Sequence, residues 1–142
     1  MAKISKNFTW AEFEKSDVAK AHHFINAVTD WDVRDNIIAL VENILQPLRD
    51  AYGKPIRINS GYRNPELNKL VGGVATSQHC FGMAADCGVD DPYALAKLAK
   101  KMGLVWDQMI LYPSFVHFSY RADGKNRMQI LYNKKWKGER DL

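Results

Sequence analysis

The sequence predicts an α+β domain in which N-terminal helices pack on a small antiparallel sheet. Two observations predict this fold class. In the first third of the chain, apolar residues recur at three- and four-residue steps, the pattern of a helix with one buried face. After residue 56, short β-rich runs alternate with Gly, Pro and Asn turn residues, which indicates strands. The length of 142 residues favours a single domain spanning residues 1–142.

Helical signals occupy the first part of the chain. Residues 9–12 (T-W-A-E) have the form of a capping box, so we expect a short helix that ends near Ser16. A weaker helical pattern covers residues 18–27. The clearest helix spans about 33–51, and Pro47 is expected to kink or shorten it. Its predicted buried stripe consists of Val33, Ile37, Leu40, Val41, Ile44, Leu45 and Leu48.

The rest of the chain mixes short strands with two further helices. Pro residues at the starts and Gly residues at the ends delimit the two helices. Turn-forming residues at 112–114 and 122–125 predict that the last three strands form two successive antiparallel hairpins. The predicted helices are 65–71 and 92–102, and the predicted strands are 56–59, 83–88, 106–111, 115–119 and 128–132.

The net charge is +4, and basic residues gather near the C-terminus. A solvated terminal surface is the usual meaning of such a cluster. Attraction to a polyanion, either nucleic acid or the anionic bacterial wall, is the alternative. No nucleic-acid-binding motif accompanies the cluster, so nucleic acid ranks last among the expected partners. The cluster comprises Lys134, Lys135, Lys137 and Arg140 around Trp136.

The sequence contains no apolar run near the roughly 20 residues that a membrane span needs. Residues 1–7 also lack the apolar core of a signal peptide. We therefore expect synthesis in the cytoplasm without a signal peptide. Action at the cell wall would then require release by another component.

Three side chains form a candidate metal site. His79 and Asp86 stand seven residues apart, with Gly82 between them to let the backbone turn back. His117 is the natural third ligand, because its neighbours in the strand 115–119 are apolar and point to the opposite face. Two imidazoles and one carboxylate are typical of catalytic zinc, which keeps a fourth position open.

A zinc ion held in this way would lower the pKa of its bound water to about 7 and would polarise a carbonyl group. The residues by themselves also allow a packed core histidine beside a capping or surface aspartate. Cys80 and Cys87 lie in the same stretch but lack the Cys-x-x-Cys spacing of a thiolate site. We expect them to be free thiols that act as small packing residues.

Five short blocks of sequence follow one another in a recognisable order. They are S-G-Y-R at 60–63, L-N at 67–68 followed by G-G at 72–73, S-Q-H at 77–79, G-M-A-A-D at 82–86 and V-H-F-S at 116–119. Together they resemble the M15 peptidase family, and most closely its small branch found in phages and prophages. That family includes zinc D-alanyl-D-alanine carboxypeptidases and phage L-alanyl-D-glutamate endolysins. The resemblance extends from about Asn7 to Tyr132.

The resemblance implies a Hedgehog/DD-peptidase-like fold with one Zn²⁺ bound by His79, Asp86 and His117. It implies hydrolysis of a peptide bond in peptidoglycan stem peptides, of either the carboxypeptidase or the endolysin type. A monomer is the expected state. The missing signal peptide fits a phage lysis enzyme that leaves the cell through a pore made by another protein.

The resemblance also implies a substrate-binding role for Arg63, whose guanidinium can clamp a carboxylate through two parallel hydrogen bonds. A structural ion pair is the alternative for this residue. Ser77 and Gln78 are expected to orient the ligand histidine or the substrate.

One departure from the family concerns the general base. Many members carry an acidic residue shortly before the last ligand histidine, and Ser114 stands there in this chain. In the nearest branch a glutamate often follows the preceding strand, at about the position of Tyr112. Asp107 is the remaining acidic candidate, either as general base or as a positioning partner of the ligand histidine. Tyr112 is a candidate hydrogen-bond donor to the developing oxyanion.

A second functional hypothesis follows from this departure. The chain could be a non-catalytic module that keeps the zinc site for stability and serves as a cell-wall-binding or phage structural part. The sequence leaves open which peptide bond a catalytic form would cut.

Overall fold

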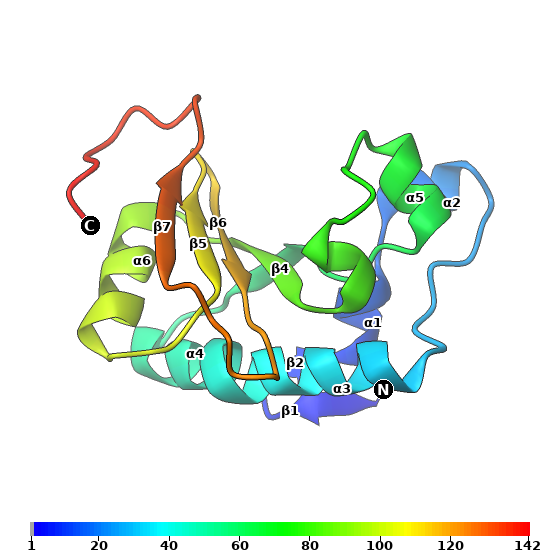
Figure 1. Cartoon of the computed structure of the whole chain (residues 1–142), viewed down its shortest axis with the longest axis horizontal. Coiled ribbons are helices and arrows are strands. Elements are labelled where there is room, and N and C mark those ends of the chain that lie inside the picture. The colour runs from blue at the N-terminus through cyan, green and yellow to red at the C-terminus, as the bar shows by residue number, and fades with distance from the viewer. Residues whose placement is uncertain (1) are drawn as a thin grey trace.

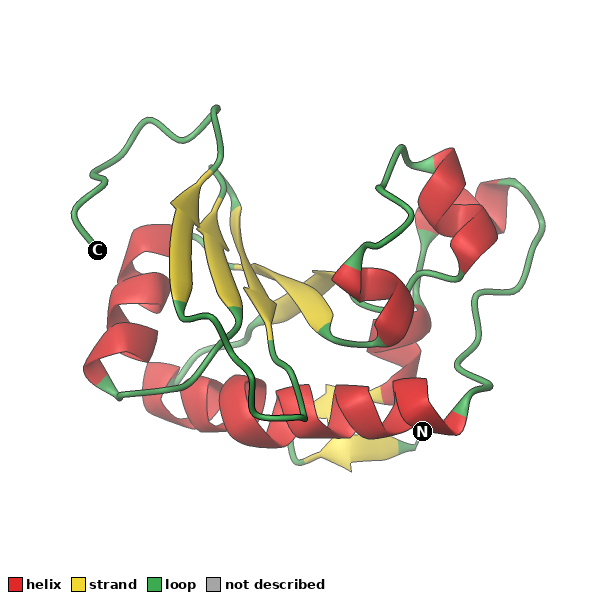
Figure 2. Cartoon of the chain, in the orientation of Figure 1, coloured by secondary structure: helices red, strands yellow, loops and turns green. Residues whose placement is uncertain are grey.

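The computed structural model describes residues 2–142, which form a mixed α+β arrangement of helices and sheet (Figure 2). A five-stranded sheet has the order β3-β4-β6-β5-β7. All neighbouring pairs are antiparallel except β5 and β7, which are parallel. The strands are β3 (Arg57–Ser60), β4 (Ala84–Gly88), β5 (Gln108–Leu111), β6 (Phe115–Ser119) and β7 (Gln129–Tyr132).

The parallel pair corrects the prediction of a purely antiparallel sheet. The first expected hairpin, β5 to β6, forms, but the second is wrong because β7 pairs with the far edge of β5 instead of with β6. Two backbone bonds place it there: Met128 N–H donates to the Trp106 carbonyl at 3.1 Å, and Gln129 N–H donates to the Asp107 carbonyl at 3.1 Å. A short strand pattern shows that a strand exists but not which neighbour it pairs with.

A long helical unit runs along one side of the sheet (Figure 1). It consists of α3 (Trp31–Leu40), the π-helical segment η1 (Val41–Leu45) and α4 (Gln46–Tyr52), which follow one another without a break. Pro47 does not shorten the helix as one of the two expectations had it, because the unit continues to Tyr52. The π-helical segment lies just before Pro47, and in this segment Gln46 N–H donates to the Val41 carbonyl five residues back. The wider turn accommodates a residue that has no N–H of its own.

The predicted apolar stripe of this unit is confirmed as core. Six of its seven residues are fully buried, and Val33 is partly buried. They pack with the apolar side chains of the central strands, including Met109, Val116 and Phe118. The helix α6 (Pro92–Lys101) packs against α4, β5 and β6. The helices therefore support one side of the strands that carry the site.

The remaining elements lie towards the N-terminal half. The capping box at Thr9 and Glu12 is present and opens α1 (Trp10–Glu14). A two-stranded sheet of β1 (Lys3–Ser5) and β2 (Phe8–Thr9) was not predicted. The helix α2 (Asp17–Ala21) is shorter than its sequence pattern. Two short helices then flank the site: α5 (Pro65–Leu70) and the 3₁₀ turn η2 (Gln78–Phe81).

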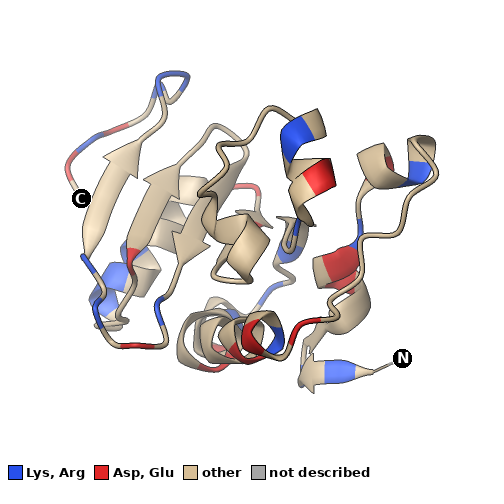
Figure 3. Ribbon diagram, turned by 45° about the vertical axis from the view of Figure 1, so that its right-hand side comes forward, with Lys and Arg blue, Asp and Glu red and all other residues tan. Residues whose placement is uncertain are grey.

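The basic C-terminal cluster lies in the segment that follows β7, where lysine and arginine are prominent (Figure 3). Its four basic side chains are exposed, while Trp136 is buried. Among residues 2–142, no helix combines the length and the apolar character that crossing a bilayer requires.

Candidate metal centre

Two of the three candidate ligands face each other across neighbouring strands. Asp86 on β4 pairs directly with His117 on β6 in the antiparallel register. Residues paired in this way project from the same face of a sheet, with Cβ atoms about 5 Å apart. The Nδ1 atom of His117 lies 2.9 Å from Oδ1 of Asp86. The register between β4 and β6 is therefore sufficient to bring two of the candidate ligands together.

The third candidate ligand, His79, is held by the short turn η2. Ser77 opens this turn, and its Oγ accepts the N–H of His79 at 3.3 Å. Gly82 ends the turn in the left-handed conformation, with φ of +71°. A Cβ atom there would lie only 2.6 Å from the Val33 carbonyl oxygen of α3. The position therefore requires glycine both for its backbone angle and for close contact with α3.

The orientation of the His79 ring is set by a backbone carbonyl. Nδ1 of His79 lies 2.7 Å from the Gly61 carbonyl oxygen. Because a carbonyl only accepts, Nδ1 carries the hydrogen, and Nε2 is left with its lone pair. That Nε2 atom lies 3.4 Å from Oδ1 of Asp86. Such a bond to the far ring nitrogen is the usual way in which proteins orient a metal-binding histidine.

The combined geometry fits a zinc ion. One ligand atom from each of His79, Asp86 and His117 can be chosen so that all lie within 4.8 Å of one another. A tetrahedral zinc with bonds of about 2.0–2.1 Å holds its ligand atoms about 3.3 Å apart. Two nitrogens and one oxygen form the donor set of an open zinc site. These three residues would hold the metal. They do not form a closed site of cysteine thiolates, which is typical of structural zinc.

The electrostatics of the site favour an ionised carboxylate. Burial opposes the charge on Asp86, but the neighbouring imidazoles of His117 and His79 outweigh it and hold the pKa of Asp86 well below its usual range. The His79 side chain is 5% exposed and that of Asp86 is 16% exposed. A carboxylate that is ionised and shielded from water is ready to bind a cation without first losing a proton.

Arg63 is tied to the same turn as His79. Its backbone N–H donates to the His79 carbonyl at 3.2 Å, and its Nη2 donates to Ser77 Oγ at 3.2 Å. Nε of Arg63 is buried and has no hydrogen-bond partner among residues 2–142. The guanidinium is thus oriented by Ser77 and keeps donors free for another group. Within the part of the chain that the structure describes, Arg63 forms no salt bridge.

Two charged residues of the site, Asp86 and Arg63, affect the pKa of the Tyr112 hydroxyl. Its ring stacks on Phe115, with centroids 4.2 Å apart. Burial is the main cause that raises the pKa of Tyr112; the Asp86 carboxylate raises it further and Arg63 lowers it. The hydroxyl therefore stays protonated at neutral pH and can donate a hydrogen bond.

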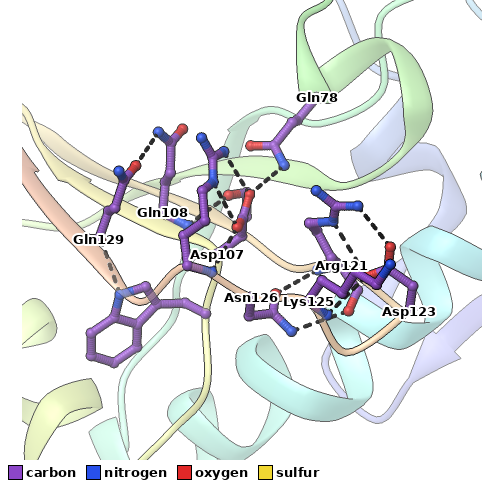
Figure 4. A network of polar contacts seen from close by, with 11 residues as sticks. Gln78, Asp107, Gln108, Arg121, Asp123, Lys125, Asn126 and Gln129 are labelled. Carbon is purple, nitrogen blue, oxygen red and sulfur yellow. Dashed lines mark hydrogen bonds and ion pairs between the residues drawn. The ribbon is translucent and has the colours of Figure 1, made fainter.

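Asp107 is engaged in a network of its own, seen in Figure 4. Its side chain is fully buried, and Arg127 donates to both of its oxygens, from Nε at 2.9 Å and from Nη2 at 2.8 Å. Gln78 donates to Oδ2 of Asp107 at 2.8 Å. The Arg127 hydrogen bonds hold the pKa of Asp107 well below its usual range, although burial opposes them. Both oxygens of Asp107 thus accept from Arg127 or Gln78, while the ring contacts of His79 and His117 are with Gly61 and Asp86 and not with Asp107.

A cleft of about 700 Å³ opens beside the metal centre. His117 lies on its wall together with Ser77 and Gln78, and the apolar Phe81 and Ile110 line it as well. Arg121 and Arg127 also line this cleft. The sequence contains no signal that points to these two arginines, because they stand in a loop and belong to none of the recognisable blocks. Another cavity of about 720 Å³ lies over β3 and α4, and none of the three candidate ligands lines it.

Fold and site together define an α+β domain in which three candidate metal ligands lie together, with His117 on the wall of a cleft large enough for a peptide. Residues 6–119 match the family described as Peptidase M15, and the chain belongs to that family. It is also 33% identical over 124 residues to the zinc D-Ala-D-Ala carboxypeptidase of Streptomyces albus G. The match covers 85% of this chain and 47% of that relative, so the chain spans about half of the relative's length.

Proposed function

We propose that this chain is a zinc peptidase that hydrolyses a peptide bond in peptidoglycan stem peptides. The observation that carries the proposal is the convergence of His79, Asp86 and His117 on one point beside the cleft. Membership of the Peptidase M15 family and the similarity to a zinc D-Ala-D-Ala carboxypeptidase support it. We infer a DD-peptidase-like arrangement of the fold on the same grounds.

The bound zinc, Arg63 and Tyr112 would each have a different role in hydrolysis. Bound zinc would supply an activated water at neutral pH and would polarise the scissile carbonyl. Arg63, oriented by Ser77, would clamp a carboxylate of the stem peptide through its free donors. Tyr112, protonated at neutral pH, would donate to the oxygen on which negative charge develops.

For Asp107 we propose a positioning role. Its buried carboxylate accepts from Gln78, the residue directly before the ligand His79, and from Arg127 on the cleft wall. With both oxygens occupied by fixed donors, it has little capacity to take a proton from water. It would instead hold Gln78 and Arg127 in place along the cleft, and would act on the candidate ligand His79 only through the neighbouring Gln78.

The proposal is tested by incubating zinc-loaded protein with purified peptidoglycan and measuring newly released amino groups. Wild type should release them, and a chelator should stop the release. His117→Ala should bind no stoichiometric zinc and should lose activity by at least about 100-fold, because two remaining ligands do not hold the ion. His22→Ala, at an exposed histidine of the same chain, is the matched control and should behave as wild type.

The same assay distinguishes the second hypothesis, a non-catalytic zinc module. The observation in its favour is that Asp107, the acidic candidate for general base, is already paired with Arg127. Stoichiometric zinc binding by wild type without release of any amino groups would support the module and contradict the peptidase.

A further inference from the structure

The cleft beside the metal centre carries two positive charges that the candidate ligands do not explain. Arg121 and Arg127 both line its wall, and Gln78 and Gln108 lie beside them. Arg127 belongs to the segment that leads into β7, and Arg121 follows β6. Neither residue is needed to bind the metal. Because both line a cleft large enough for a peptide, they are placed to contact the molecule that binds there.

Arg127 is held in a fixed orientation. Its Nε and Nη2 atoms each donate one hydrogen bond to the carboxylate of Asp107, which is completely buried. A guanidinium carries five N–H donors in a rigid planar fork, so its outer edge keeps donors free. The Arg127 side chain is 48% exposed, and Arg127 lines the cleft. A buried carboxylate thus orients the cation without occupying its accessible edge.

Arg121 adds a second cation to the same wall. It pairs with Asp123 at 2.7 Å, and both of these side chains are more than one third exposed. Exposed pairs of this kind are weak, so Arg121 can exchange its partner for a ligand carboxylate at little cost. The two arginines differ in character: Arg127 is rigidly oriented, whereas Arg121 is adaptable.

The sheet order places Arg127 and Arg63 on opposite sides of the metal centre, while Arg121 follows β6, the strand that carries His117. Arg63 follows β3 at one edge of the sheet, and Arg127 precedes β7 at the other edge. Asp86 on β4 and His117 on β6 lie between them in the order β3-β4-β6-β5-β7. Arg127 lines the cleft beside His117, whereas Arg63 lines a neighbouring cavity of about 300 Å³. A peptide whose scissile bond lay over the metal would have one of these cations on each side.

We propose that Arg127, assisted by Arg121, binds a second substrate carboxylate, on the other side of the scissile bond from the carboxylate that Arg63 clamps. This inference rests on the proposed peptidase function and specifies its substrate class: a peptide with acidic groups flanking the bond on both sides. A stem peptide cut next to its free C-terminus meets this requirement, with the terminal carboxylate on one side and an acidic residue upstream. A cut between L-alanine and D-glutamate does not, because the alanine side carries no carboxylate. The subsite thus favours the carboxypeptidase type.

Two peptides that differ in one group test the subsite. One is the pentapeptide L-Ala-γ-D-Glu-L-Lys-D-Ala-D-Ala, and the other has the D-glutamate α-carboxylate replaced by an amide. Wild type should cleave both at the last bond and should prefer the acid peptide in kcat/KM. Arg127→Gln should lower kcat/KM for the acid peptide about 10-fold, mainly through KM, because a charge-assisted bond is lost. The amide peptide should change less than about 3-fold.

Controls separate the subsite from effects on folding. Arg57→Gln removes one exposed arginine of β3 outside this cleft and should leave the preference unchanged. Because Arg127→Gln leaves the buried Asp107 without its cation, Arg127→Lys and Arg121→Gln are measured beside it. Lysine keeps the charge and should retain part of the preference. Arg121→Gln disturbs only an exposed pair and should reduce the preference about 3-fold.

A binding measurement makes the result independent of catalysis. Calorimetry of both peptides with chelator-treated protein reports affinity while no cleavage occurs. Wild type should bind the acid peptide more tightly, and Arg127→Gln should bind the two alike. Equal affinities in wild type, or equal losses for both peptides in the variant, would overturn the subsite. Absence of cleavage by zinc-loaded wild type, with the difference in binding preserved, would refute the peptidase function and leave the subsite standing.

Discussion

A single backbone carbonyl decides which nitrogen of His79 is available to a metal. The Gly61 oxygen takes the hydrogen of Nδ1, so Nε2 faces Asp86. Gly61 must itself be glycine, because a Cβ atom would lie 2.7 Å from the Phe13 ring. At the residue scale, the site therefore depends on contacts behind the ligands as much as on the ligands themselves.

The role of Asp107 leads to a prediction about pH dependence. Its pKa is held well below the usual range by Arg127, so the carboxylate stays ionised throughout the range in which a peptidase is assayed. Asp107→Asn should therefore leave the acidic limb of the kcat/KM profile where it is, while activity falls about 10-fold and KM rises. Loss of that limb together with a fall in kcat of about 1000-fold, at unchanged zinc content, would instead identify Asp107 as the general base. Asp35→Asn, at an exposed aspartate of α3, is the matched control.

The pair of Arg127 and Asp107 also predicts how stability depends on pH. A carboxyl whose folded pKa is depressed stabilises the protein above its unfolded pKa of about 3.9, and this contribution is lost as the pH falls through the folded pKa. Arg127→Met should therefore destabilise the protein most at neutral pH, by about 2 kcal/mol, a value reduced from that of a fully buried pair because Arg127 is half exposed. The difference from wild type should shrink below about pH 4.

Urea unfolding between pH 3 and pH 7 measures this dependence. Arg121→Met, which breaks the exposed pair with Asp123, is the control and should leave the stability nearly unchanged at every pH. A destabilisation by Arg127→Met that is the same at all pH values would show that lost packing, and not the ion pair, is responsible.

At the element scale, the site is built where a tight turn meets two paired strands. The register of β4 against β6 sets Asp86 opposite His117, and η2 brings His79 to the same face. The turn keeps its place because Gly82 touches α3, and because Asn36 of α3 donates to the Phe81 carbonyl at 2.9 Å. The long helix thus supports the ligand turn as well as the core.

This contact predicts different effects for two alanine substitutions. Gly82 and Gly124 both have positive φ, but a Cβ atom at Gly124 would meet nothing within 4 Å. Gly124→Ala should cost only the backbone strain, about 1–2 kcal/mol. Gly82→Ala should cost more than that and should also weaken zinc binding at least about 10-fold, because η2 must move away from α3. Chemical denaturation and zinc titration of the two variants measure the difference; equal effects would contradict the role assigned to the turn.

At the scale of the whole molecule, the metal centre links segments that are far apart in the chain. His79 follows α5, while His117 belongs to β6 on the other side of α6 in the chain order. The helical unit α3–η1–α4 packs its buried stripe into the same core as β5 and β6. A metal that binds only the folded chain therefore stabilises the molecule as a whole.

Zinc should raise the unfolding temperature of the entire domain. At a free zinc concentration of 100 times Kd, the gain is about 2.7 kcal/mol, which corresponds to a rise in Tm on the order of 10 °C for a domain of this size. Thermal unfolding followed by circular dichroism, with zinc and with chelator, measures the shift. His117→Ala should show no zinc-dependent shift. A shift of the same size in that variant would place the stabilising zinc elsewhere.

Local signals account for what the sequence by itself determined. Short-range spacing predicts three features, because each depends on residues that are close in sequence. They are the capping box at Thr9, the apolar stripe of the long helix and the turn at Gly82. His79 and Asp86 stand close in sequence as well, and the structure brings both together with His117 as the pattern suggested.

Only the tertiary structure decided which distant segments become neighbours. The pairing of β7 with β5 is parallel and non-local, and it carries Arg127 to the buried Asp107 and onto the cleft wall. The sequence around residue 127 contains no signal for this, because a strand pattern specifies faces but not partners. The choice of partner depends on how all five strands share one core, which no single segment encodes.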